Sequence, residues 1–260
     1  RSTAELVNVV PSSKPSDAYK AVADKAKEFL PSYMHHWMDR SVCKRTVMTI
    51  PYNATKDSSR KYIREALLEK KIDPTTDELT QIVNAVYQSM DSIVPGPMQV
   101  MRWIKKHVGL YIRNGAKEVQ WVTPSGFIVN QRRDNIETKQ MELQLLGRTQ
   151  VRLPTGKSTP SPTKHKSSTA PNYIHSFDAS ILHRSFTQFD EPFTVIHDSV
   201  LCRAGDMGTL NRLVRETYTN IFSEECWLSR FAETINASEP PPIVGTLDPK
   251  VVSNSTYFFC

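Results

Sequence analysis

The sequence predicts an α+β fold that is mostly helical. In the first half of the chain, apolar residues recur at spacings of three and four, which is the pattern of amphipathic helices. Beyond residue 118 the apolar residues alternate with a period of two around turn-forming residues, which is typical of strands. No apolar run approaches the roughly 18 residues that a membrane-spanning helix needs, so no membrane partner is expected.

Predicted helices follow one another up to residue 113. The first is capped by Ser16-Asp17 and stops before Pro31. The second spans residues 34–50 and stops at Pro51, whose ring crowds the preceding turn and whose nitrogen has no proton to donate. Further helices are expected over residues 56–70, 77–91 and 97–113.

Strands are predicted in the second half. Residues 119–123 and 127–131 flank Pro-Ser-Gly and form a hairpin signal, and residues 137–146 read as a further strand. Later, strands over 192–196 and 199–202 lie between helices over 177–189 and 207–222. The proline-rich residues 236–260 cannot form one long helix.

A basic segment separates the two groups of strands. No Asp or Glu occurs from Leu143 to Phe177, whereas Lys and Arg recur, and residues 154–171 are rich in Ser, Thr and Pro. This composition buries little apolar surface, so we expect a mobile basic loop, either a nucleic-acid contact or a passive linker. The net charge of +6 also favours a polyanionic partner.

The predicted second helix carries a basic stripe. Arg40, Lys44, Met48 and Tyr52 follow one another at i,i+4 spacing, so a helix would present two cations, a thioether and a phenol along one face. Such a face suits a nucleoside triphosphate. A solvated helix face is the alternative interpretation.

The second hairpin carries a lone carboxylate at its tip. Asp198 lies between two apolar β-type runs, where rigid strands can hold an exposed Asp for a divalent metal. An ordinary hairpin turn is the alternative. Together, the stripe and the carboxylate suggest nucleotidyl transfer.

These motifs also occur in one known family. Lys44-Arg-x-x-Met-Thr-x-x-Tyr52 followed by His197-Asp-Ser199 resembles the single-subunit RNA polymerases of phages and mitochondria. Further matches in the family's order are Trp121-Val-Thr-Pro-Ser-Gly-Phe127, Ala170-Pro-Asn-Tyr-Ile-His-Ser-x-Asp178 and the closing Tyr257-Phe-Phe-Cys260.

The resemblance implies the fingers and the C-terminal part of the palm of a right-hand polymerase. Residues 1–175 would be the fingers, with the motif B helix at 34–52 and a specificity hairpin and basic loop at 137–171. Residues 176–260 would be the C-terminal palm, with the His-Asp-Ser hairpin and a C-terminal foot.

The implied activity is template-directed RNA synthesis from ribonucleoside triphosphates on DNA, with two Mg²⁺ ions. Asp198 would be a catalytic residue and metal ligand. The family's other catalytic aspartate, in an Asp-Gly-Ser motif, has no counterpart in this sequence. A second subunit, as in a split heterodimeric phage polymerase, or another part of the same chain would supply it.

The family's other site positions transfer residue by residue. Lys44, Tyr52 and His197 would be catalytic, with Tyr52 monitoring the ribose. Substrate-binding positions fall on Arg40, Arg45, Met48 and His175. The family's base-reading positions fall on Gln140, Glu142, Gln150 and Arg152, which could instead simply hold their hairpin together.

Alternatives remain open at this stage. A family-A DNA polymerase would usually carry Phe in place of Tyr52 and Glu in place of Ser199, and a non-catalytic nucleic-acid-binding scaffold would not need Asp198. Asp57 replaces the aromatic residue that helps to open DNA in relatives, which implies a single-stranded template or an accessory opening protein. The expected location is the cytoplasm of a phage-infected bacterium rather than the mitochondrion.

Overall fold

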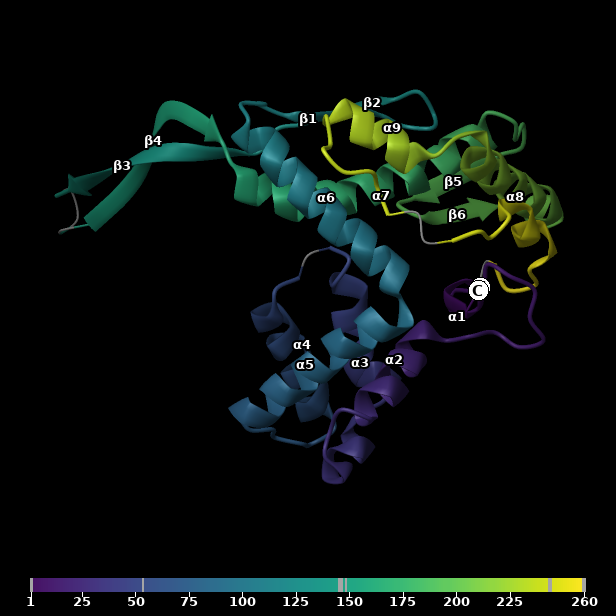
Figure 1. Cartoon of the computed structure of the whole chain (residues 1–260), viewed down its shortest axis with the longest axis horizontal. Coiled ribbons are helices and arrows are strands. Elements are labelled where there is room, and N and C mark those ends of the chain that lie inside the picture. The colour runs from purple at the N-terminus through teal and green to yellow at the C-terminus, as the bar shows by residue number, and fades with distance from the viewer. Residues whose placement is uncertain (1, 53, 145–146, 148, 243–244, 259–260) are drawn as a thin grey trace.

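The computed structural model describes residues 2–52, 54–144, 147, 149–242 and 245–258 (Figure 1). A lower group of helices and an upper layer of helices and hairpins are joined by one long helix (Figure 1). The helices are α1 Ser2–Leu6, α2 Ala18–Lys27, α3 Arg40–Thr49, α4 Lys56–Glu69, α5 Thr76–Ile93, α6 Pro95–Arg113, α7 Pro162–Phe186, α8 Met207–Glu224 and α9 Trp227–Thr234. Short 3₁₀ helices are η1 Ser32–Trp37, η2 Ala204–Asp206 and η3 Pro249–Asn254.

The strands form separate antiparallel hairpins. They are β1 Val119–Val122 with β2 Ile128–Gln131, β3 Asp134–Leu143 with β4 Thr149–Pro160, and β5 Phe193–Ile196 with β6 Ser199–Cys202. The α+β, mostly helical prediction is therefore confirmed for the described residues. The predicted strand 137–146 begins earlier than expected, at Asp134, and its residues 145–146 lie outside the described part.

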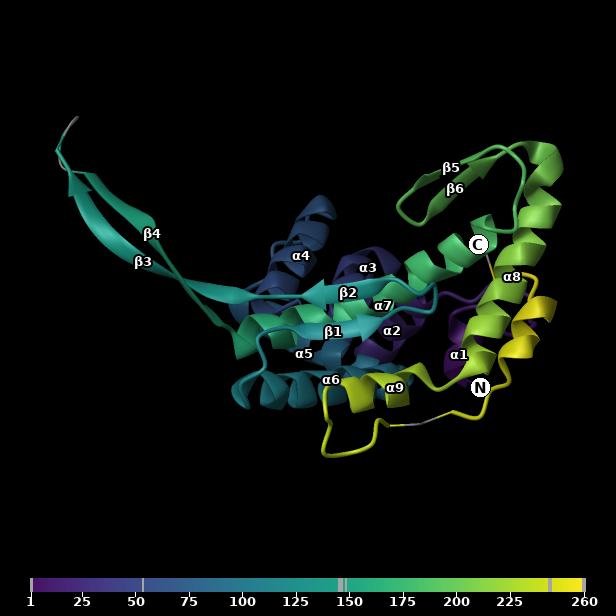
Figure 2. The same cartoon turned by 90° about the horizontal axis from the view of Figure 1, so that it is seen from above.

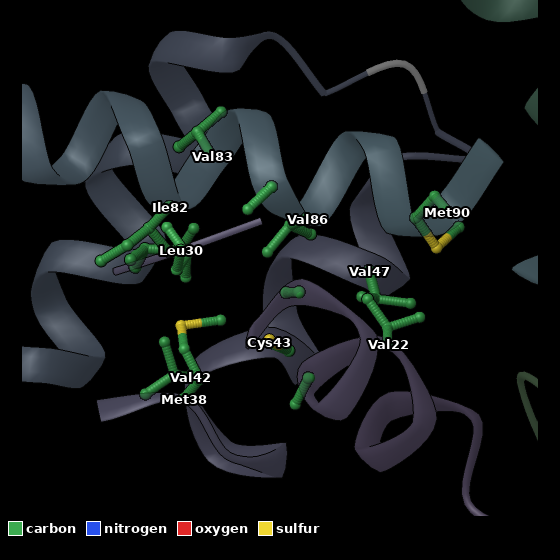
Figure 3. Close-up of a cluster of buried hydrophobic side chains, with 14 of the residues drawn as sticks. Val22, Leu30, Met38, Val42, Cys43, Val47, Ile82, Val83, Val86 and Met90 are labelled. Carbon is green, nitrogen blue, oxygen red and sulfur yellow. The ribbon is translucent and has the colours of Figure 1, made fainter. Parts of the chain in front are cut away.

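The lower group, α2 to α5, is a helical unit around its own core. Caps define its helices: Asp17 accepts the N–H groups of Tyr19 and Lys20, and Thr75 forms a capping box with Glu78. Apolar side chains from each helix meet in one cluster, which Figure 3 shows around Val86 and Cys43. This cluster fixes the position of α3, which carries the basic stripe.

A second core joins α6, α7, α9 and the β1–β2 hairpin. The rings of Trp103, Trp121 and Tyr173 surround Phe231, which is 1% exposed, with centroids 6.5, 6.2 and 4.7 Å from it. The Tyr173 hydroxyl donates to the carbonyl of Trp227 at 2.8 Å. Aromatic packing and this buried hydrogen bond hold α7 in register.

The prediction of a mobile loop over residues 154–171 is wrong. β4 continues to Pro160, and α7 begins at Pro162 with Ser161 as its N-cap. Buried polar groups add to the apolar burial of Ala170 as a source of order. His165 Nδ1 donates to the Ser161 carbonyl at 2.8 Å, and its Nε2 accepts the Arg133 N–H. Thr169 accepts from the Gln131 amide at 2.7 Å.

The predicted helix over residues 177–189 is therefore the second half of α7, which ends at Phe186. This helix runs without interruption through position 175. After α7 the predicted hairpin and helix follow in order as β5, β6 and α8, whereas α9 was not predicted. The tail is tied to the start of the chain, because the Ser255 hydroxyl donates to the Asn8 carbonyl at 2.6 Å; Phe259 and Cys260 lie outside the described residues.

The β3–β4 hairpin is an arm. It extends well away from every other element in both views (Figures 1 and 2). At its base the Ser161 N–H donates to the Arg133 carbonyl at 2.8 Å, which joins the arm to the start of α7. None of the described helices combines the length and the apolar character that crossing a membrane requires.

Candidate active site

The basic stripe lies on α3, which begins later than predicted. Residues 34–50 do not form one helix: the 3₁₀ turn η1 ends at Trp37, Met38 is extended, and Asp39 caps α3. The Asp39 carboxylate accepts the N–H groups of Ser41 and Val42 at 2.9 and 3.2 Å, so it satisfies donors that a longer helix would use internally.

One face of α3 is buried, and the opposite face carries the stripe. Val42, Cys43, Thr46 and Val47 pack into the lower core. Arg40, Lys44 and Met48 therefore share the exposed face. Tyr52 lies beyond the helix, in a turn where its N–H donates to the Thr49 carbonyl at 3.0 Å, because Pro51 follows the last helical turn.

The cations of α3 differ in their partners. Arg40 Nε lies 2.6 Å from a carboxylate oxygen of Asp17, and the guanidinium lies over the Tyr19 ring. Lys44 is exposed and makes no ion pair within the part of the chain that the structure describes. Lys44 is thus the stripe cation that can receive an anion without first losing a protein partner.

Arg45 faces a different neighbour. Its guanidinium lies 2.7 Å from Glu65 and 4.1 Å from the centre of the Tyr62 ring, both on α4. The structure therefore groups Arg45 with α4 rather than with the stripe.

Tyr52 meets α7 at His175. Their ring centroids are 4.9 Å apart with an interplanar angle of 30°, a stacked pair between residues far apart in the sequence. Tyr173 and Phe177 are buried on the opposite face of α7, and the Trp121 indole N–H donates to the Ser176 hydroxyl at 3.0 Å. This packing presents His175 outward, toward Tyr52.

Asp198 lies at the tip of the β5–β6 hairpin. The predicted strands are confirmed, with Ile196 paired to Ser199 across a His197-Asp198 turn. His197 has a φ of 57°, a left-handed conformation that His enters more readily than most non-glycine residues. At the base, Phe193 stacks on Phe186 of α7 with centroids 4.0 Å apart, which anchors the hairpin to the same helix.

Electrostatics link these parts. The pKa of Tyr52 is raised, first by loss of hydration and then by the negative charges of Asp178 and Asp198. Loss of hydration also raises the pKa of Asp178, an effect that His175 opposes and the negative charge of Asp198 reinforces. Charges therefore act between three parts of the structure: the end of the basic stripe, the outward face of α7 and the hairpin tip.

Asp178 is the residue that sequence reasoning missed as a site member. It was noted only as part of a matching motif. Its i,i+3 spacing from His175 was the available signal, since residues so spaced share a helix face.

The chemistry of Asp198 fits one ligand of Mg²⁺. Its carboxylate is exposed, makes no ion pair with the described Lys and Arg residues, and offers the oxygen donors that this cation prefers. Among the residues that the structure describes, no group of three or more His, Cys, Asp or Glu side chains could hold a metal.

The four residues expected to read bases share one face of the arm. Gln140 pairs with Arg152 and Glu142 with Gln150 across the β3–β4 ladder, so their side chains point to the same side. All four are exposed, and the Gln140 amide donates to the Gln150 side chain. The face is accessible, and part of it is also used to hold the hairpin together.

Sequence comparisons relate this chain to known proteins. A sequence profile of DNA-dependent RNA polymerases matches residues 1–240. The chain is 27% identical to the human mitochondrial DNA-directed RNA polymerase over 98% of the chain and 24% of that protein. It is 26% identical to the DNA-directed RNA polymerase of Pseudomonas phage phiKMV (86% of the chain, 28% of that protein) and 27% identical to T7 RNA polymerase of Escherichia phage T7 (87% and 30%). The chain spans between 24% and 30% of the length of these relatives.

The cap of α3 gives a testable pH dependence. Desolvation opposes ionisation of Asp39, but the Lys70 ion pair and the Ser41 and Val42 hydrogen bonds outweigh it and lower the Asp39 pKa to about 2. Because the folded-state pKa lies below the unfolded value, this stabilisation is present above about pH 4 and is lost as pH falls toward 2. We expect it to be about 1 kcal/mol, since solvent screens this half-exposed pair.

Urea unfolding of wild type and Asp39→Asn at about pH 5 and at lower pH measures this effect. Asn can keep the cap but not the charge. The variant should therefore lose less stability on acidification than the wild type. Identical losses would contradict the assigned role of the Asp39 carboxylate.

Proposed function

Because this chain belongs to the family of DNA-dependent RNA polymerases, we propose that it carries the nucleotide-binding helix and one catalytic aspartate of an enzyme that synthesises RNA on a DNA template. The observation that carries the proposal is the meeting of Tyr52 with His175 within the field of Asp198. This brings the end of a basic stripe to an exposed carboxylate, as template-directed nucleotidyl transfer requires.

In the proposed reaction the 3′-hydroxyl of the growing RNA attacks the α-phosphate of a ribonucleoside triphosphate, and pyrophosphate leaves. Lys44 is the cation best placed to bind the triphosphate, because it is exposed and has no ion pair among the described residues. Arg40 joins it by exchanging Asp17 for phosphate oxygens. Both charges then offset the negative charge that develops on the leaving group.

Asp198 would hold Mg²⁺, which when bound stabilises the charge on the attacking and leaving oxygens. The second catalytic carboxylate belongs, in this proposal, to a segment outside these 260 residues, in the same polypeptide or in a second subunit. The coverage of about a quarter of the relatives' length supports this division.

The remaining predicted residues complete the insertion site in this proposal. Tyr52 and His175 form a stacked surface that faces the ribose and the new base pair. Met48, 45% exposed on the stripe, contributes an apolar contact beside the nucleotide, and His197 shapes the turn that presents Asp198. Arg45 supports the site through α4. In domain terms, residues 1–175 are fingers and 176–260 palm, joined through α7.

We propose further that the arm reads promoter bases. Arg152 and the two glutamines offer the donors and acceptors that pair with guanine and adenine edges, and Glu142 can accept from cytosine. A two-stranded ribbon fits the major groove. Its projection from the rest of the molecule supports this role (Figure 2). An accessory opening protein or a single-stranded template remains part of the proposal, because Asp57 cannot stack on a base.

Replacement of the hairpin carboxylate tests catalysis against a scaffold role. In the complete polymerase, Asp198→Asn should lower RNA primer extension by at least about 100-fold, because the amide is a poor Mg²⁺ ligand. Template binding should remain, since the residue is exposed and the shape of the side chain is kept. Normal extension by this variant would make the chain a scaffold, and extension with deoxyribonucleotides in preference to ribonucleotides would make it a DNA polymerase.

Removal of the stripe cation tests triphosphate binding. Lys44→Ala should reduce kcat/KM for ribonucleotides by about 100-fold, the scale of losing one charge-stabilising donor in an active site. The melting temperature should not change, because the side chain is exposed. Lys61→Ala is the matched control, an exposed lysine on α4; an equal loss in both variants would point to general charge rather than to a site.

Two substitutions in the arm separate the reading of bases from general attraction to the DNA backbone. Arg152→Ala should cost about 1–3 kcal/mol of discrimination at one promoter position and leave other positions unchanged. Lys157→Ala, on the same strand, should weaken binding to all sequences alike. Competition binding with single-base promoter variants measures both. Uniform weakening by Arg152→Ala would assign this residue to backbone contact.

A further inference from the structure

The arm is held at its base rather than by packing along its length. No side chain whose burial the structure describes between Asp134 and Pro160 is buried, and the arm stands clear of the other elements (Figure 2). Both of its strands start from one place, because Arg133 leads into β3 and Ser161 follows β4 as the N-cap of α7. The direction of the arm therefore depends on how this place is attached to α7.

One face of α7 makes the attachment through hydrogen bonds. Its members follow one another at spacings of four, four and three, so they share that face: Ser161, His165, Thr169 and Asn172. The Ser161 N–H donates to the Arg133 carbonyl at 2.8 Å, and the His165 Nε2 accepts the Arg133 N–H at 3.2 Å. Both backbone groups of Arg133, the residue before the arm, are thus bound to the start of α7.

The side chain of Gln131, the last residue of β2, makes the other half of the attachment. Its amide group donates to the Thr169 hydroxyl at 2.7 Å, and its oxygen accepts from the Asn172 amide at 2.7 Å. The Thr169 hydroxyl gives its own hydrogen to the His165 carbonyl at 2.8 Å, so toward Gln131 it can only accept. Gln131 and Thr169 are 5% and 0% exposed, and a buried polar group that loses its partner is unfavourable. We call these hydrogen bonds between α7 and residues 131–133 the arm junction.

A small tilt at the arm junction would have a large effect at the base-reading residues. Gln140 lies six residues beyond Asp134 and pairs with Arg152, so both stand about 20 Å along the arm. A tilt of about 10° at the base would move them by about 3–4 Å, which is about one base-pair step of a DNA duplex. His175 lies one turn beyond Asn172 on the same helix, so α7 positions both the arm and the proposed insertion site.

We propose that the arm junction sets the distance between the promoter bases that the arm holds and the first nucleotide that is inserted, and thereby selects the position at which RNA synthesis starts. The inference rests on the proposed function, because it needs an arm that reads bases. Thr169 and Gln131 are its central positioning residues. They are buried between α7 and β2, so they act through the direction of the arm rather than by touching DNA or nucleotide.

The test uses the complete polymerase and maps the 5′ ends of transcripts from a promoter template, beside extension of an RNA primer on a template without promoter. Thr169→Val removes the hydroxyl and keeps the side-chain shape. It should spread the start over adjacent positions and lower kcat/KM for the promoter by about tenfold, while primer extension stays within about twofold of wild type. Thr169→Ser keeps the hydroxyl and should restore the single start. Thr163→Val, an exposed threonine in the first turn of α7, is the control.

A second variant decides the question if Thr169→Val does not fold. Asn172→Ala opens the other end of the Gln131 contact at a half-buried position and should spread the start sites in the same way. A single start at the wild-type rate would overturn the inference, and so would equal losses of promoter-dependent synthesis and primer extension. The proposed function of the arm fails separately, when Arg152→Ala leaves base discrimination unchanged. Lost discrimination in that variant together with a single start in Thr169→Val sinks only the positioning role.

Discussion

The register of α7 is the constraint on which the rest of the molecule depends. Tyr173 and Phe177 lock the middle of this helix into the aromatic core around Phe231. Its first residues hold the base of the arm, and its last ring, Phe186, stacks on the hairpin that carries Asp198. The arm, the residues of the proposed insertion site and the hairpin carboxylate are thus spaced along one helix. A rotation of α7 about its axis would move all of them together.

The sequence was sufficient to predict those helices and hairpins whose structure follows from local periodicity. The helices α2, α4, α5 and α6 carry apolar residues at helical spacing, the first three begin at capping side chains and α6 begins at Pro95, and all four were predicted within a few residues. The hairpins around Gly126 and Asp198 were predicted for the same reason, because turn chemistry and alternation agree there.

The sequence did not predict those parts of the structure that depend on contacts between residues far apart in the chain. The first half of α7 looked disordered because its order comes from His165 and Thr169, whose hydrogen bonds reach the β2 and β3 region. The start of α3 was predicted too early, because Met34 and Met38 extend the apolar period toward the N-terminus. In the structure the Asp39 side chain caps the helix, so α3 begins only at Arg40. The stack of Tyr52 on His175 could not be read from spacing, and neither could the inclusion of Asp178, since both depend on how α3 and α7 meet.

The differing partners of the three α3 cations suggest how one short helix could, in the proposed function, bind a highly charged substrate and remain folded without it. Arg45 is held between Glu65 and Tyr62, so its role in the empty protein is to join α3 to α4. Arg40 is held by Asp17, but an exposed ion pair contributes at most about 1 kcal/mol, and bonds from arginine to phosphate easily exceed that. Asp17 thus keeps the guanidinium extended at little energetic cost, and in the proposed function a triphosphate would replace it. With Lys44 left unpaired among the described residues, the stripe combines a cation ready to bind with one that is already oriented.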